Sequence, residues 1–205
     1  MSWLKERNRR ASAFLRGEFA DTLWMCAAAF GLLMVAGFVL GLILDDFAVG
    51  LVENFSRQVE DMGIIGDDGT ISAFALLKNN TTATLFTISY GFIPYIFLPA
   101  LSLGTNSILL GAFAAYYVHE GQSLLLYLAG ILPHGIFELP AIVLAVAMGI
   151  YLCKKINTFI KENPKGVMVP LMTDLACVFV LRLLPLLITA SVVEAYITPL
   201  VMSLF

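Results

Sequence analysis

Residues 79–118 read NNTTATLFTISYGFIPYIFLPALSLGTNSILLGAFAAYYV and contain no side chain that is charged at neutral pH. A single helix of this length would be roughly 60 Å long, about twice the hydrocarbon thickness of a bilayer. The stretch must therefore turn back at least once. We expect two membrane passes, at 81–99 and 100–118, with a turn near residues 104–106. An uncharged run of this length predicts an all-α integral membrane protein.

The composition of the whole chain supports the same class. Of the 205 residues, 60% are hydrophobic and only 13% are charged, and the mean hydropathy is +0.89. A soluble domain of this size carries about 25% charged residues, which it needs to cover its surface. The composition therefore excludes an ordinary soluble domain.

Three further apolar segments complete one membrane domain over residues 1–205, with about five transmembrane helices. They cover residues 22–44, 123–153 and 183–205, and residues 167–181 suit a helix at the inner interface. The first segment carries Gly37 and Gly41 in a G-x-x-x-G spacing, which lets two helix backbones approach closely. That spacing leaves open both packing within the chain and a homodimer.

Charge distribution predicts how the chain is oriented. Most basic residues form two clusters, and the acidic segment between the first two apolar runs holds only Arg57 and, at its end, Lys78. The clusters are Lys5, Arg7, Arg9, Arg10 and Arg16, and Lys154, Lys155, Lys161 and Lys165. Because basic residues stay on the cytoplasmic side, we expect residues 1–21 and 154–166 in the cytoplasm and the C-terminus outside the cell membrane. The short basic clusters are explained by topology, so membrane lipids are the expected partner and nucleic acid is not.

Residues 45–79 form the only sizeable polar segment, and it is acidic. Leu51, Val52, Phe55 and Val59 recur there at helical spacing. We expect an extracytoplasmic amphipathic helix resting on the outer surface, followed by a turn at 66–69.

Three ionisable residues fall inside predicted passes: His134, Glu138 and Glu194. Such groups cost about 2.5–3.5 kcal/mol or more at bilayer depth, so they mark a functional site by default. His134 and Glu138 are four residues apart and share one helix face. One alternative is that they only bond each other and a neighbouring helix. Glu194 needs a partner from another helix.

Prolines next to these groups predict a helix break inside the membrane. Pro133, Gly135 and Pro140 interrupt the segment 123–153, and each proline removes one backbone hydrogen bond. Either the segment is one long kinked helix, or two half-helices meet at residues 133–135. Broken helices with polar groups at the break are how many transporters build a binding site.

Asn80 and Asn106 are further candidates for this polar core. Asn80 belongs to the run Asn79-Asn-Thr-Thr82, which also suits the N-cap of a helix starting there. Asn106 allows the same two interpretations.

Signatures of catalysis are missing from the sequence. It contains no H-E-x-x-H zinc-protease motif, no serine-hydrolase G-x-S-x-G motif and no paired intramembrane aspartates. His134 and Glu138 could supply two metal ligands, but no third or fourth stands nearby in the sequence, so no metal or other cofactor is predicted. We expect a protein that is not an enzyme.

The stretch Leu132-Pro-His-Gly-Ile-Phe-Glu-Leu-Pro-Ala141 resembles the signature of the stage II sporulation protein M family. Asn79-Asn80, the Gly104-Thr-Asn106 segment and Glu194-Ala-Tyr-Ile-Thr-Pro199 are also similar to that family, over most of residues 20–203. The resemblance implies a polytopic membrane protein. In spore formers, members work with a lytic transglycosylase and an amidase/endopeptidase that remodel septal peptidoglycan.

Two functions follow from these observations. The resemblance implies a non-catalytic membrane subunit that anchors or assists envelope-remodelling enzymes. The polar core favours an ion, proton or small-solute transporter or channel that uses His134, Glu138 and Glu194. A pure anchor has no need of charges at bilayer depth.

Overall fold

A computed structural model describes residues 2–62, 64, 70–162 and 166–205 of the chain. Its helical elements are α1 (Ser2–Arg16), α2 (Phe19–Ile43), α3 (Asp45–Asp61), α4 (Ala73–Ser89), η1 (Tyr90–Phe92), α5 (Pro99–His119), α6 (Leu124–Glu162), α7 (Met168–Val178), η2 (Phe179–Leu183), α8 (Leu184–Val192), η3 (Val193–Ile197) and α9 (Thr198–Met202). The predicted all-α class is confirmed. The predicted turn at 66–69 lies outside the described residues.

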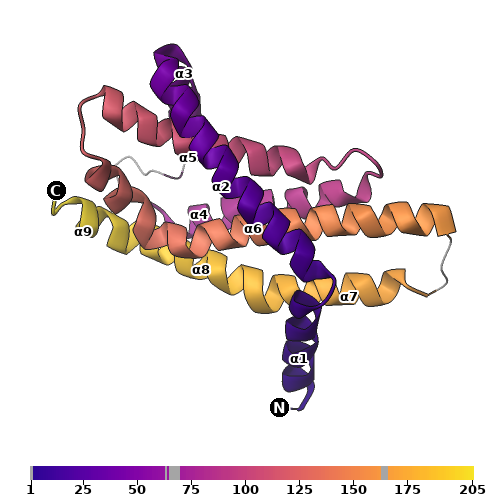
Figure 1. Ribbon diagram of the computed structural model, residues 1–205. Helices are drawn as coiled ribbons and strands as arrows, with labels where there is room; N and C mark the ends of the chain where they lie inside the picture. Colours follow the sequence, from indigo (N-terminus) through magenta and orange to yellow (C-terminus); the bar gives the residue numbers. More distant parts are fainter. Residues whose placement is uncertain (1, 63, 65–69, 163–165) are drawn as a thin grey trace.

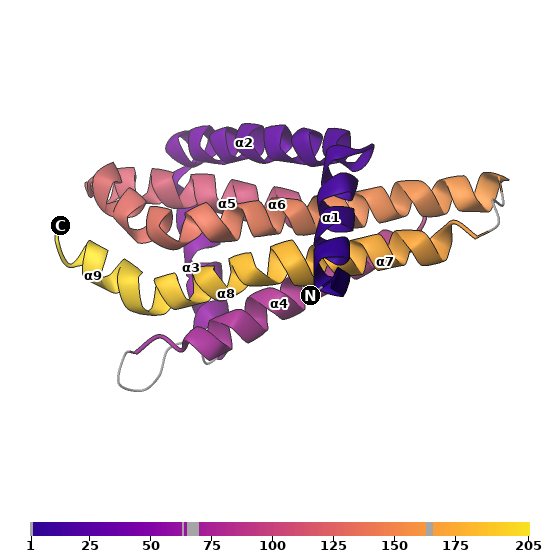
Figure 2. The same ribbon diagram turned by 90° about the horizontal axis from the view of Figure 1, so that it is seen from below.

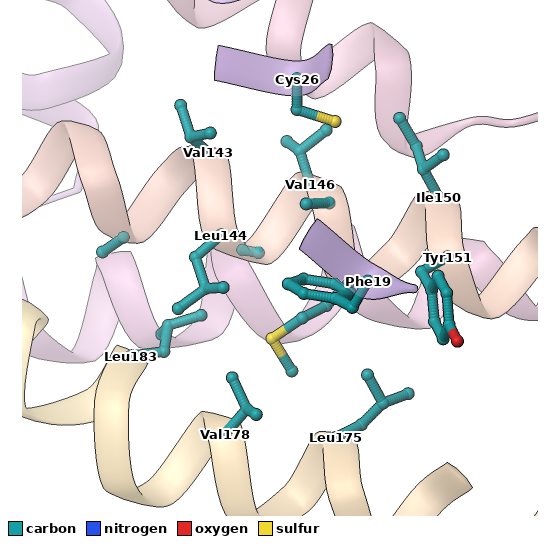
Figure 3. Close-up of a cluster of buried hydrophobic side chains, with 14 of the residues drawn as sticks. Phe19, Cys26, Val143, Leu144, Val146, Ile150, Tyr151, Leu175, Val178 and Leu183 are labelled. Carbon is teal, nitrogen blue, oxygen red and sulfur yellow. The ribbon is translucent and has the colours of Figure 1, made fainter. Parts of the chain in front are cut away.

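Helix α6 is the centre of a bundle of long helices. α2 and α5 pack against it, and so do α4 and α8. Figure 2 shows α2 on one side of the α5 and α6 layer and the α7–α9 helix on the other. Residues 143–153 of α6 are all buried. Figure 3 shows Val146 of α6 between Cys26 of α2 and Val178 of α7, so this part of α6 forms the hydrophobic core.

The outer surface of the bundle is apolar. α2 turns Trp24, Leu32 and Ile43 away from the protein, and 70–73% of each of these residues is exposed. A helix that is apolar on every side and still exposed is typical of contact with lipid. This surface agrees with the membrane class.

Four helical segments of the described residues are long and apolar enough to cross a membrane: Phe19–Ile43, Pro99–His119, Leu124–Glu162 and Met168–Met202. α4 has 17 residues and continues into the three residues of η1. Together they span roughly 30 Å, close to the hydrocarbon thickness. The expected number of about five passes is a rough count that includes α4.

Three predictions about where helices begin and end need correction. The segment 123–153 lies in one continuous helix that runs through Pro133 and Pro140, so the alternative of one long helix is correct and the predicted break at residues 133–135 is wrong. Each proline removes one backbone hydrogen bond, a loss that membrane helices tolerate when neighbouring helices and side chains satisfy the freed backbone groups. Residues 167–181 are likewise not separate from the last pass, because they begin the continuous helix Met168–Met202.

The third wrong boundary concerns α4 and α5. α4 begins at Ala73, where the Ser72 side chain accepts a hydrogen bond from the Ala75 N–H at 3.2 Å. The chain reverses within residues 90–98, and residues 104–106 lie inside α5. Pro99 stands in the first turn of α5, where a proline needs no hydrogen-bond partner for its nitrogen.

Gly37 and Gly41 of the G-x-x-x-G segment face α5. A Cβ atom on Gly37 would collide with the backbone of Ile108, and one on Gly41 would lie 2.6 Å from the Ala115 Cβ. Gly37 and Gly41 therefore let α2 and α5 pack closely within one chain. Packing within the chain was one of the two alternatives that the G-x-x-x-G spacing left open.

Helices α1 and α3 run across the bundle instead of along it (Figures 1 and 2). α1 packs on α7, where Arg10 pairs with Asp174. Arg182 adds a hydrogen bond to Asn8 at 2.7 Å. α3 forms a helix within the polar segment 45–79 and packs on α5, with the Phe55 ring 5.4 Å from the Phe113 ring.

Candidate functional site

A cavity of about 440 Å³ lies inside the bundle, between α4, α5, α6 and the helix that carries Glu194. Phe55 and Val59 of α3 line it at one end, and Ala145 and Leu187 line it deeper in the bundle. Its polar wall consists of Asn79, Asn80, Thr84, Thr87, Ser102, Asn106, His134, Glu138 and Glu194. The rest of the wall is mainly aliphatic and aromatic. A few polar groups converging in an apolar cavity are typical of a small-molecule or ion site.

His134, Glu138 and Glu194 lie together in this cavity. One nitrogen or oxygen atom from each lies within 4.8 Å of the others. His134 Nε2 is 3.8 Å from Glu138 Oε2, and the two side chains are only 12% and 20% exposed. That separation is too long for a direct hydrogen bond. It leaves room for a third atom between the imidazole and the carboxylate.

Asn80 of α4 completes the cluster. Its Nδ2 donates a hydrogen bond to Glu138 Oε1 at 3.1 Å. Asn80 lies in the second turn of α4, so the alternative that this run is an N-cap is wrong. Asn106 lines the same cavity, but its amide donates to the Ser102 carbonyl in its own helix at 2.8 Å.

Thr198 holds the imidazole of His134 from the opposite side. Its Oγ1 lies 3.2 Å from His134 Nδ1 and 3.3 Å from the Val193 carbonyl oxygen. The carbonyl can only accept, so the hydroxyl proton points to it and the hydroxyl oxygen accepts from Nδ1–H. We therefore assign the neutral ring proton to Nδ1, which leaves the lone pair of Nε2 directed at Glu138.

The two helices that carry His134, Glu138 and Glu194 position these side chains in different ways. In α6 the spacing of four residues puts His134 and Glu138 on one face. Glu194 instead lies in η3, a π-helical turn over Val193–Ile197, and Thr198 follows it directly. The wider turn changes the direction of the side chains that follow. Single π turns inside α-helices often occur at functional sites.

The three residues that were expected to break a helix lie in α6, close in sequence to His134 and Glu138. Pro133 and Pro140 both stay inside α6, and Gly135 lines the cavity beside His134. Sequence reasoning missed Thr84, Thr87 and Ser102, because a hydroxyl in a membrane helix usually bonds its own backbone. The Thr87 hydroxyl instead donates to Ser102 Oγ at 3.1 Å and links α4 to α5.

The chemistry of the cluster is that of a ligand site. It offers one imidazole nitrogen and two carboxyl groups, and their mutual distances suit a metal ion. The cysteines contribute nothing here: Cys26, Cys153 and Cys177 are free thiols, and none of them lines the cavity. Glu194 was expected in the same polar core as His134 and Glu138, and it reaches this position from a different helix.

A profile of the family described as stage II sporulation protein M matches residues 22–199, which include every residue of the cluster. Neither a curated protein nor a solved structure matches the chain. The match covers most of the chain and agrees with the resemblance carried by residues 132–141. The chain therefore belongs to the stage II sporulation protein M family.

Proposed function

We propose that the protein is a non-catalytic, multi-pass subunit of the cell membrane that assists envelope remodelling by binding a small polar or cationic ligand in its cavity. Membership of the stage II sporulation protein M family supports the role of a membrane subunit. By the resemblance, its partners are peptidoglycan enzymes such as a lytic transglycosylase and an amidase/endopeptidase. The cavity supplies a ligand-binding site, which a simple anchor lacks.

The observation that carries the proposal is the convergence of His134, Glu138 and Glu194 on one cavity. Each ionisable group in a membrane helix costs about 2.5–3.5 kcal/mol, and a lipid-facing anchor needs none of them. Asn80 and Thr198 add hydrogen bonds that orient two of the three groups. Groups that are oriented around an open cavity are better explained by a ligand than by packing.

The proposed orientation has α1 in the cytoplasm and α3 outside. α1 is basic, with Arg7, Arg9, Arg10 and Arg16, whereas α3 begins with Asp45 and Asp46. The positive-inside rule favours this arrangement. Both helices run across the bundle, as helices that lie at the two surfaces of a membrane do. The cavity then lies beneath the extracytoplasmic helix α3.

Transport of an ion, proton or small solute is the second candidate. It is favoured by the depth of the cavity, which extends from Phe55 beneath α3 to Ala145 and Leu187 within the bundle. Transport requires that the cavity also open toward the other end of the bundle. The two candidate functions use the same site and differ in whether the ligand crosses the membrane.

Complementation of a strain that lacks the native protein tests the proposal. Glu138→Gln keeps the shape of the protonated acid but cannot become an anion. We expect normal membrane insertion and partner recruitment with lost function. Glu162→Gln is the matched control, because Glu162 is an exposed acid at the end of the same helix. We expect this control to complement fully.

Neutralising the exposed acids of α3 separates the two alternatives. Asp46, Glu53 and Glu60 are exposed and do not line the cavity. If the cavity carries the function, changing these three acids to their amides should impair function less than Glu138→Gln does. If Glu138→Gln complements fully while the α3 variant loses both function and enzyme recruitment, the protein is an anchor and the cavity proposal fails.

A further inference from the structure

The geometry points to a divalent transition-metal ion, in the class of Zn²⁺ and Mn²⁺, as the ligand held by His134, Glu138 and Glu194. This inference rests on the proposed function, because it names the ligand of the same cavity. It uses the three side chains as direct ligands and Asn80 and Thr198 as the groups that orient them.

The distances suit one shared ion. Two ligand atoms that are each about 2.1 Å from an ion lie about 3.4 Å apart at the tetrahedral angle, and up to roughly 4.2 Å apart when they face each other across the ion. His134 Nε2 and Glu138 Oε2 are 3.8 Å apart and fall within that limit. The ligand atoms of all three residues lie within 4.8 Å of one another, so binding one ion requires these side chains to move slightly closer together.

The imidazole is prepared for coordination. A metal-binding histidine needs a free lone pair on one nitrogen and a hydrogen-bond acceptor for the other. Here Thr198 accepts from Nδ1–H at 3.2 Å, which directs the lone pair of Nε2 toward the carboxylates. Asn80 similarly binds Oε1 of Glu138 and leaves Oε2 free. His134 Nε2 and Glu138 Oε2 are therefore both available to a shared ligand.

Charge balance favours a divalent ion over a monovalent one. Two ionised carboxylates this close repel each other strongly where the dielectric constant is low. A divalent ion neutralises both, and the neutral imidazole adds no charge. The ion, Glu138, Glu194 and His134 together are then electrically neutral, as a site at bilayer depth requires.

The donor set also selects among metals. An imidazole nitrogen suits zinc, iron and similar ions, whereas Mg²⁺ and Ca²⁺ prefer oxygen ligands alone. No cysteine lines the cavity, so no thiolate is present there to favour Cu⁺. Three protein ligands leave a coordination position open toward the cavity, where water or a further ligand can bind.

Metal binding to the full-length protein in lipid nanodiscs, with any histidine tag removed, tests the inference. We expect Mn²⁺ and Zn²⁺ to bind at one site per chain. Pulsed electron paramagnetic resonance of bound Mn²⁺ should show coupling to one imidazole nitrogen in the unaltered protein. Absence of saturable binding, absence of nitrogen coupling, or equal affinity for Mg²⁺ would overturn the inference. This readout needs no variant, so it holds even if a variant misfolds.

Variants then locate the site. Glu138→Gln and Glu194→Gln should each weaken Zn²⁺ binding at least tenfold, and Thr198→Val should weaken it by about ten- to a hundredfold. Glu162→Gln should bind as the unaltered protein does. Each variant is compared at the same elution volume and helical circular dichroism. Equal affinity in all four variants would place the metal elsewhere and overturn the inference.

The metal inference and the proposed function fail in different ways. If the unaltered protein binds no metal while Glu138→Gln still loses complementation, the metal is excluded and the cavity keeps its proposed role. If metal binds at the site but Glu138→Gln complements fully, the metal site stands and the proposed function fails.

Discussion

The side-chain amide of Asn80 donates a hydrogen bond of 3.1 Å to the Glu138 carboxylate and so joins α4 to α6 within the membrane bundle. Glu138 Oε2, on the other side of the same carboxyl group, faces His134. Asn80 thus connects α4 to the cluster of His134, Glu138 and Glu194.

Asn80→Ala should destabilise the protein by about 1–3 kcal/mol, because it leaves a buried Glu138 oxygen without its donor. Thermal unfolding in detergent measures this change. Asn106→Ala is the matched control, since Asn106 lines the same cavity but bonds only a carbonyl in its own helix. We expect it to cost less, about 0.5–1.5 kcal/mol. Equal losses of stability from both variants would mean that the Asn80–Glu138 hydrogen bond contributes no more to stability than the Asn106 hydrogen bond within α5 does.

Phe55 should control access to the cavity. Its ring packs edge-on against Phe113 and lines the end of the cavity beneath α3. Such a pair contributes about 0.5–1.5 kcal/mol, so Phe55→Ala should speed thiol modification of a cysteine at Thr84 roughly two- to twelvefold. The rate is measured in a background without the three native cysteines.

Phe74→Ala is the control for this experiment, because Phe74 is 76% exposed and does not line the cavity. It should leave the modification rate unchanged. The same acceleration by both variants would show that α3 does not cover the cavity.

The contact between α2 and α5 should tolerate no added methyl group at Gly37. Gly37→Ala would bring a Cβ atom into the Ile108 backbone, and we expect a loss of about 1–3 kcal/mol in unfolding free energy. Gly31→Ala on the same helix meets no atom within 4 Å and should change stability by about 1 kcal/mol or less. Similar effects of the two variants would contradict the close packing of these helices.

Thiol labelling from outside tests the proposed orientation. Single cysteines at Glu60 and Glu120 should react with an impermeant reagent in intact cells, and one at Lys161 only after the membrane is opened. All three positions are exposed in the structure. Reaction at position 161 in intact cells, with position 60 protected, would show that the orientation is reversed.

Much of the fold was predictable because its signals are local. An uncharged run such as 79–118 predicts membrane helices wherever it occurs, and the spacing of Val52, Phe55 and Val59 predicts an amphipathic helix. The turn between α4 and α5 was misplaced because residues 104–106 resemble a turn, whereas the reversal lies in the apolar residues 90–98.

The proline prediction failed for a physical reason. Pro133 and Pro140 each disfavour a helix, but α6 lies at the centre of the bundle and is packed by helices on several sides. Membrane helices tolerate such missing hydrogen bonds when neighbouring helices and side chains satisfy the freed backbone groups. His134, Glu138 and Glu194 were each identifiable as charges within apolar runs. Their distances from one another, and the contact from Thr198, depend on how α6 packs against η3 and α9.

An experimental density map of the protein in a lipid environment tests the central claim most directly. We predict that the carboxyl group of Glu194 faces His134 and Glu138 across one cavity, with density for a ligand between the three side chains. A map in which Glu194 points into the lipid, or lies beyond the reach of one bridging atom from both other residues, would contradict the account.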